Sequence, residues 1–331
     1  MADRSRIEWT EATWNPVTGC DRISPGCDHC YALTLAARLK AMGQAKYQAD
    51  GHPATSGPGF AVTVHPAAVT LPLRWRSPRM VFVTSMGDLF HDAVPDGFVA
   101  AVFAVMALAR RHTFQLLTKR HARLQALLTR PAFATAVAEY ATGLIGSRPW
   151  RRWQLDLADR TATPPPRGTM LGTPPWPLPN VHIGVSVETQ RWADIRIPAL
   201  LQTPAALRWV SAEPLLGPID LDPFLRPDCL CPDANLETHY YIDHCPSHGA
   251  DRRVLDWVVV GGESGPAARP CHPQWVRDLR DQCAAAQVAF FFKQWGGRSP
   301  KAGGRLLDGR TWERYPTAAL GTPTTPEPSR S

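Results

Sequence analysis

Short apolar runs that recur between longer, helix-like stretches are the feature that most restricts the fold of this chain. They are Met80–Ser85, Thr113–Leu117, Val181–Val187, Leu207–Val210, Trp257–Val260 and Val288–Phe292. Runs this short and this uniformly apolar are typical of parallel strands covered on both faces, and the segments between them are long enough for crossover helices. Apolar residues also dominate from Asp96 to Ala109, which predicts a buried helix. The alternation predicts a parallel α/β sheet, either open or closed into a partial or full (β/α) barrel.

The length and composition suit a globular protein with a substantial core. The chain has 331 residues, 44% of them hydrophobic, which is enough for one large domain. We expect this domain to span residues 1–315, with insertions at about 146–179 and 226–253, followed by a disordered tail at 316–331 that is rich in Thr and Pro. The first residues are charged, and the sequence has no apolar stretch long enough for a membrane span, so we expect a cytoplasmic protein without membrane association.

Polar residues follow several of the predicted strands directly. They form the groups Ser85–Asp88, Thr118–Arg120, Ser186–Glu188, Ser211–Glu213 and Gly261–Ser264. Each group alone is also what a helix N-cap or turn requires. The carboxyl ends of parallel strands are nevertheless where such sheets collect functional side chains, so the five groups together predict a site at one end of the sheet.

Three cysteines near the N-terminus predict a metal centre. Cys20, Cys27 and Cys30 lie in one short loop before a predicted helix at Leu33–Met42, and Pro25 and Gly26 permit the turn between them. We expect no signal peptide, and eight cysteines in a long chain of that kind favour metal or redox chemistry over disulfides. Thiolates bind both iron–sulfur clusters and zinc, and three ligands leave a fourth coordination position open.

The sequence also resembles a known family over about residues 6–315. The motifs that carry this resemblance are Ile7-Glu-Trp-Thr-Glu-Ala-Thr-Trp-Asn-Pro-Val-Thr-Gly-Cys20, Ser24-Pro-Gly-Cys-Asp-His-Cys-Tyr-Ala32, Leu116-Leu-Thr-Lys-Arg120, Gly184-Val-Ser-Val-Glu188, Ser211-Ala-Glu-Pro-Leu-Leu-Gly217, Gly261-Gly-Glu-Ser-Gly265 and Lys293-Gln-Trp-Gly296. It is similar to the uncharacterised phage and bacterial family named after phage gene products thirty-seven and sixty-eight, a domain of unknown function with a three-cysteine motif.

That motif in turn resembles the radical SAM superfamily. The resemblance implies a (β/α) barrel of that type and a [4Fe-4S] cluster on Cys20, Cys27 and Cys30, whose fourth iron holds S-adenosylmethionine (SAM). It also implies an electron donor, and reductive cleavage of SAM to a 5′-deoxyadenosyl radical that abstracts hydrogen from the substrate. The spacing here is C-x6-C-x2-C, whereas that superfamily usually has C-x3-C-x2-C.

Roles carried over by position fall on strand-end residues. By resemblance, Gly87 and Asp88 after the Met80–Ser85 strand lie near the methionyl amine, as the polar motif of strand two does in that superfamily. Ser186 and Glu188 reach ribose or methionyl groups, and the Gly261-Gly262 turn approaches the adenine. The implied cofactor-binding residues are Gly87, Asp88, Ser186, Glu188, Gly261 and Gly262. Lys119 and Arg120 are candidates for neutralising a carboxylate or phosphate of the substrate.

A second group of cysteines provides another candidate metal site. Cys229, Cys231, Cys245 and His248 follow a C-x-C-x13-C-x2-H pattern in a segment too polar to form its own core. Four such ligands predict zinc, and a loop of ordinary reduced cysteines is the alternative.

Two functions therefore remain open. The first is an iron–sulfur enzyme, radical SAM-like, that acts on a nucleic acid or nucleotide, which a formal net charge of +7 favours. The second is a non-catalytic nucleic-acid-binding protein with a structural cluster or zinc, whose insertion residues Arg148, Arg151 and Arg152 contact phosphates among tryptophans.

Overall fold

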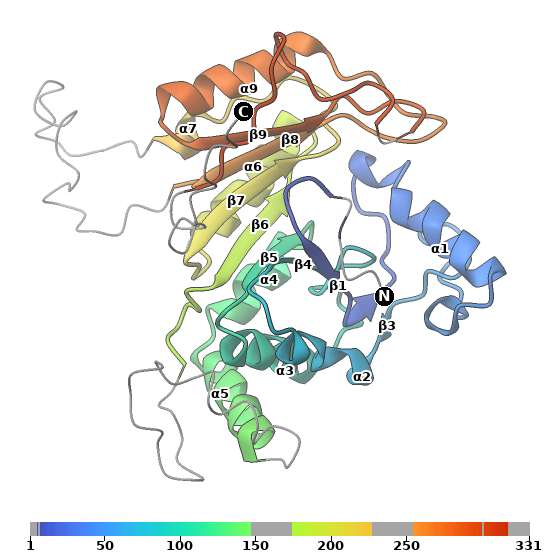
Figure 1. Ribbon diagram of the computed structural model, residues 1–331, viewed down its shortest axis with the longest axis vertical. Helices are drawn as coiled ribbons and strands as arrows, with labels where there is room; N and C mark the ends of the chain where they lie inside the picture. The colour runs from blue at the N-terminus through green and yellow to red at the C-terminus, as the bar shows by residue number, and fades with distance from the viewer. Residues whose placement is uncertain (1–4, 6, 147–173, 227–253, 300, 317–331) are drawn as a thin grey trace, which may run out of the picture.

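An open sheet of parallel strands forms the centre of the protein. The computed structural model describes residues 5, 7–146, 174–226, 254–299 and 301–316. Seven strands follow one another across this sheet in chain order, and each is parallel to the next. They are β1 (Ala12–Trp14), β4 (Met80–Val83), β5 (Thr113–Thr118), β6 (Val181–Ser186), β7 (Leu207–Ala212), β8 (Trp257–Gly261) and β9 (Ala289–Gln294). The sheet curls into a half-barrel flanked by helices, with β1 and β9 at its edges (Figure 1).

Helices connect successive strands and cover one face of the sheet. The described helices are α1 (Tyr31–Ala41), α2 (Pro66–Val69), α3 (Asp96–Leu108), α4 (His121–Leu128), α5 (Pro131–Gly146), α6 (Gln190–Leu201), α7 (Asp222–Leu225) and α9 (Pro273–Ala285), with short 3₁₀ turns η1 (Pro25–Cys27), η2 (Ala45–Tyr47) and η3 (Leu71–Arg74). Helix α6 packs on β6 and β7, and α9 packs on β9. None of the helices in the described part of the chain is both long and apolar enough to cross a membrane.

Alternate residues of β4, β7, β8 and β9 enter two separate cores. Val258 and Val260 of β8 belong to the large core between the sheet and the helices. Trp257 and Val259 of the same strand point to the opposite face, where they join a smaller aromatic core. This two-residue alternation explains why the strands are apolar throughout, because both faces of the sheet are covered.

The smaller core fills the inner, concave side of the half-barrel with aromatic rings. Trp9 packs edge-on against Phe82 at 4.7 Å and against Trp209 at 5.2 Å between ring centroids. Trp257 and Phe291 extend the cluster. Because Trp9 precedes β1, the N-terminal segment closes the inside of the curved sheet and leaves open the end at which the strands finish.

The structure confirms the predicted strand and helix pattern. The six apolar runs form β4 to β9, all parallel, and the apolar segment from Asp96 to Ala109 forms α3, with eight buried residues. Helix α1 covers most of the predicted Leu33–Met42 helix but begins at Tyr31. Of the two alternatives for the sheet, the open half-barrel is the observed one.

Three short strands were not predicted. Strand β1 is only three residues long, and the two-residue strands β2 (Val17–Thr18) and β3 (Thr63–Val64) pair antiparallel to each other. Such short elements carry no periodic signal in a sequence. Strand β2 has a structural role, because it leads directly into Cys20.

Candidate functional site

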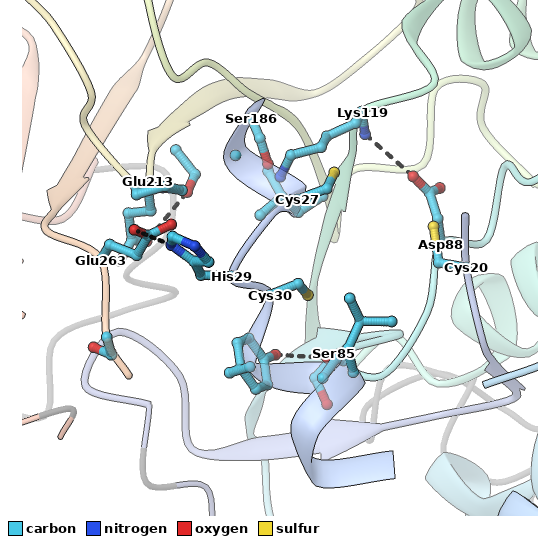
Figure 2. A pocket seen from close by; sticks show the side chains of 18 of the residues that line it. Cys20, Cys27, His29, Cys30, Ser85, Asp88, Lys119, Ser186, Glu213 and Glu263 are labelled. Carbon is cyan, nitrogen blue, oxygen red and sulfur yellow. Dashed lines mark hydrogen bonds and ion pairs between the residues drawn. The ribbon is translucent and has the colours of Figure 1, made fainter. Parts of the chain in front are cut away.

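The three N-terminal cysteines line one cavity at the strand ends of the half-barrel (Figure 2). Cys20 follows β2, Cys27 ends the turn η1, and Cys30 immediately precedes helix α1. All three are free and partly buried. They share a cavity of about 600 Å³ with residues from the ends of β4 to β9. The structure therefore brings the three cysteines and the strand-end residues together in one place.

Two hydrogen bonds tie the cysteine loop to the first strands of the sheet. The Tyr31 hydroxyl donates to the Ser85 carbonyl, just after β4, at 2.6 Å. The Arg120 guanidinium, just after β5, donates to the Asp21 carbonyl at 3.4 Å and lies 3.9 Å from the Cys20 sulfur. The loop is therefore held on the side of β4 and β5 near both of its ends.

Two glutamates tie the same loop to later strands. Ser24 donates to Glu188, which follows β6, at 2.8 Å. The His29 Nδ1 atom lies 2.9 Å from an oxygen of Glu263, which follows β8. With the contacts to β4 and β5, these bonds fix the cysteine loop across the mouth of the half-barrel.

Two glycines allow the loop to approach the sheet closely. Gly19 has a φ of +87°, and a Cβ there would lie 2.1 Å from the Ala61 carbonyl oxygen. A Cβ on Gly26 would lie 2.3 Å from Cγ of Glu188. Both distances are far below van der Waals contact, so glycine is required at each position if the loop is to keep its place.

Burial keeps the Cys20 and Cys30 thiols protonated in the absence of a metal. Burial raises the pKa of Cys20 to about 12. The negative charge of Asp88 also acts to raise this pKa, and the positive charge of Arg120 acts to lower it. Burial likewise raises the pKa of Cys30, although nearby Lys119 lowers it. A metal or cluster must displace these protons, and Lys119 and Arg120 are placed to offset part of the negative charge that three thiolates would bring.

A single metal ion has no ready-made group of ligands here. Within the residues that the structure describes, no three His, Cys, Asp or Glu side chains are grouped so as to hold one ion. The thiols instead face a common cavity from three points of the loop. The donor set is suited to iron–sulfur chemistry, because thiolates are the usual cluster ligands and each binds a separate iron.

Only some of the predicted cofactor-binding residues line the cavity. Gly87, Asp88, Ser186 and Gly262 line the cavity. Asp88 already accepts hydrogen bonds from the Thr118 hydroxyl at 2.7 and 2.8 Å and from two backbone N–H groups. Its carboxylate therefore organises the turn after β5 in addition to facing the cavity.

Glu188 lies behind the cavity wall with no exposed surface. Its carboxylate contacts Arg196 of α6, also fully buried, at 3.0 Å and Lys119 at 3.5 Å. Arg196 in turn stacks over the Trp192 ring at 4.1 Å. The described contacts of Glu188 make it an anchor for the cysteine loop.

The remaining predicted residues also divide between the cavity and its surroundings. Gly261 lies beside the cavity, whereas the next residue, Gly262, lines it. The Lys119 side chain faces the cavity, and Arg120 contacts Asp21 and Asp92. Burial acts to lower the pKa of Lys119, but the neighbouring Glu188 carboxylate, together with Cys27 and Cys30, outweighs it. The pKa is raised, so this lysine is cationic.

Residues that sequence reasoning did not assign form the opposite wall. Glu213 and Lys293 make an ion pair at 2.9 Å, and both face the cavity. In Figure 2, Glu213 and Glu263 lie on the far side of Cys27 and Cys30 from Cys20 and Asp88. Both glutamates belong to polar groups noted after strands, but the sequence did not show which partners they would meet.

Glu263 is the second acidic residue of this wall. It accepts hydrogen bonds from the Arg269 backbone and side chain and from His29. Burial alone would raise the pKa of Glu263, but these hydrogen bonds outweigh it and lower the pKa from 4.5 to about 2. Arg269 also donates to the Pro25 carbonyl, so this network binds the cysteine loop to the end of β8.

The second cysteine group and the arginine-rich insertion fall outside the described residues. This applies to Cys229, Cys231, Cys245 and His248, for which zinc was predicted, and to the insertion arginines at 148, 151 and 152. The zinc site stays a prediction.

Comparison with known proteins identifies a family but no function. Residues 4–316 match the family described as "Protein of unknown function (DUF5131)", and the chain belongs to this family. No curated protein and no solved structure matches the chain.

Proposed function

We propose that this DUF5131 protein is a radical SAM-like iron–sulfur enzyme that acts on a nucleic acid or a nucleotide. The observation that carries the proposal is the joint placement of Cys20, Cys27 and Cys30 in one cavity at the strand ends of a parallel half-barrel. Barrel enzymes build their active sites at this end of the sheet. The net charge of +7 supports a polyanionic substrate.

The cysteine loop provides what a cluster with one open iron needs. Cys20, Cys27 and Cys30 would each bind one iron of a [4Fe-4S] cluster, and the fourth iron would remain available to SAM. When bound and reduced, such a cluster supplies the electron for cleavage of SAM. Lys119 and Arg120 offset the thiolate charge, and the bonds from Tyr31 and His29 hold the loop in place.

The cavity walls provide for SAM and substrate. Gly87, Asp88, Ser186 and Gly262 line the part of the site that the proposal assigns to SAM. Apolar residues, among them Trp9 and Phe82, also line the cavity. An apolar lining would protect a reactive species from side reactions with water, and reduction requires an external electron donor.

Cluster assembly tests the first half of this proposal. Protein reconstituted anaerobically with iron and sulfide should contain about four irons per chain and show the visible absorption of a cluster. Cys20→Ala, Cys27→Ala and Cys30→Ala should each lose most of this iron. Cys271→Ala is the matched control, because Cys271 is also a free, partly buried cysteine but does not line the cavity. Bound zinc in place of iron, or full clusters in the three variants, would refute the assignment.

Cleavage of SAM tests the second half. With a strong reductant, the clustered protein should form 5′-deoxyadenosine, measured by chromatography, and the three cysteine variants should not. Clustered protein that forms none with DNA, RNA or nucleotides present would exclude the radical enzyme.

The positive charge also supports a second candidate, a nucleic-acid-binding protein with a structural cluster. That protein would bind nucleic acid with an affinity that falls steeply with salt concentration. It would show neither SAM binding nor SAM cleavage, which separates it from the enzyme.

A further inference from the structure

The ion pair of Glu213 and Lys293 is the most distinctive polar feature of the cavity wall. It joins the ends of β7 and β9, and its two charged atoms are 2.9 Å apart. The Glu213 side chain is 14% exposed and that of Lys293 is 21% exposed, so both are mostly withdrawn from water but reach the cavity. A ligand in the cavity therefore meets an acceptor and a donor side by side.

The neighbours of Glu213 fix its orientation. The Ser211 hydroxyl donates to one carboxylate oxygen at 3.1 Å. On the other side lies Gly261, where a Cβ would come within 2.7 Å of the second oxygen. The carboxylate is therefore held in one position, as a recognition group must be.

The rest of the cavity suits a flat, largely apolar ring. Ile7, Trp9, Phe82 and Leu117 line it, and apolar side chains of this kind commonly form the walls of ligand sites. Two cationic residues, Arg22 and Lys301, also line it, and both are exposed, Lys301 to 78%. Base recognition commonly combines such apolar surfaces with hydrogen bonds to the base edge and cations for the phosphates.

From these contacts we infer that the wall formed by β7 and β9 binds a guanine base. Guanine presents a carbonyl oxygen, a ring N–H and an amino group along one edge, which is one acceptor beside two donors. The two donors match the carboxylate oxygens of Glu213, and the carbonyl accepts from the Lys293 ammonium. The inference names the substrate class of the proposed enzyme and so rests on that proposal.

Other bases match the pair less completely. Adenine and cytosine each offer one amino donor next to a ring acceptor, so part of the carboxylate goes unused. Uracil and thymine place a ring N–H between two carbonyls, one of which would face Glu213 and repel it. Hypoxanthine has the guanine carbonyl and ring N–H but lacks the amino group, which makes it the sharpest probe of the second hydrogen bond.

Equilibrium binding of mononucleotides tests the inference without any catalytic readout. Isothermal titration of the reconstituted full-length protein should give GMP the highest affinity among GMP, IMP, AMP and UMP. Loss of one charge-assisted hydrogen bond should weaken IMP relative to GMP by roughly tenfold. Measurable binding of GMP and IMP with equal affinity, or a preference for AMP or UMP, would overturn the inference.

A single-stranded oligonucleotide identifies the source of the base. An oligonucleotide with one central guanine is compared with the same sequence containing hypoxanthine. Discrimination between these two, with no GMP binding, supports guanine within a nucleic acid, and GMP binding alone supports a free nucleotide. Failure of both arms overturns the inference.

Variants locate the discrimination on the proposed pair. Glu213→Gln should weaken GMP binding by roughly tenfold or more and bring the GMP and IMP affinities close together. Lys293→Met should weaken both nucleotides alike, because both retain the carbonyl. Asp281→Asn is the charge-matched control, since Asp281 is an exposed residue of α9 outside the cavity lining. Unchanged discrimination in folded Glu213→Gln would contradict the assignment, and the wild-type comparison of GMP with IMP remains decisive if the variant misfolds.

The same preparations separate this inference from the proposed function. Iron, sulfide and 5′-deoxyadenosine are measured on each sample. Guanine discrimination without a cluster or SAM cleavage would refute the proposed enzyme but support the guanine-binding site. A cluster and SAM cleavage without guanine discrimination would refute only the guanine-binding site.

Discussion

The ends of β6 and β7 carry the same short pattern with opposite results. Ser186-Val-Glu188 and Ser211-Ala-Glu213 follow neighbouring strands, and the two serines are paired in register. Glu188 is completely buried against Arg196, whereas Glu213 faces the cavity in a pair with Lys293. Matching residues at matching positions of adjacent strands thus have different surroundings.

The difference follows from where each partner lies along the chain. Arg196 belongs to α6, the helix that directly follows β6, so Glu188 is neutralised within its own strand–helix unit. Lys293 belongs to β9, so Glu213 finds its partner across the curved wall. A local partner lets a carboxylate become structural, whereas a distant partner leaves it facing the space between the strands.

The largest effect we expect comes from Glu188→Gln. It leaves Arg196 and Lys119 buried beside a neutral amide, and loss of one member of a buried ion pair costs roughly 3–5 kcal/mol. Urea unfolding should show this loss in the free energy of unfolding. A loss in the free energy of unfolding below about 1 kcal/mol would show that the buried Glu188 does not stabilise the fold in the way proposed.

Gly26→Ala should have the next largest effect. The added methyl group would overlap the Glu188 side chain, and overpacking of this kind lowers the free energy of unfolding by about 1–3 kcal/mol. The displaced cysteine loop should also hold less iron after reconstitution. Gly143→Ala in α5 is the control, because a Cβ there meets nothing within 4 Å. Equal stability and equal iron content in the two variants would contradict this close packing.

The third glutamate, Glu263, allows a test by pH. Its pKa of about 2 in the folded protein lies below the ordinary 4.5, so its ionised form stabilises the protein above pH 4.5, and this contribution is lost as the pH falls toward 2. Glu263→Gln should therefore destabilise at neutral pH, and its difference from wild type should shrink between pH 4.5 and 2. The effect should be smaller than at Glu188, because Arg269 and His29 are 31% and 36% exposed. A pH-independent difference would exclude this explanation.

The smallest effect on stability should come from Glu213→Gln. Its partner Lys293 still reaches water through the cavity, so we expect a change within about 1 kcal/mol by urea unfolding. The same Glu→Gln substitution should therefore cause a large loss in the free energy of unfolding at Glu188 and a small one at Glu213. Similar losses at Glu188 and Glu213 would remove the distinction between them.

The sequence predicted the fold well because its signal is local. Strands such as β8 are buried on both faces, so the apolar run Trp257–Val260 is visible without knowledge of its neighbours. The three cysteines were also predictable as a group, because they lie in one short loop. Strand β1 escaped prediction, since three residues give no period.

The pairing of strand-end residues could not be predicted in the same way. Glu188 and Glu213 have the same local pattern, and neither segment shows that Lys293 of the distant strand β9 will reach Glu213. The role of His29 likewise depends on the end of β8, which is remote in sequence. Such contacts are decided by tertiary packing, which one sequence does not display.

The most direct test of the account is electron paramagnetic resonance of the reduced, reconstituted protein before and after addition of SAM. The account predicts a [4Fe-4S] signal that changes when SAM binds at the open iron, in wild type and in Cys271→Ala alike. Cys20→Ala, Cys27→Ala and Cys30→Ala should lack the signal. A full-strength cluster signal that SAM leaves unchanged would contradict an open iron in this cavity, and the absence of any cluster signal from wild type would contradict the cluster itself.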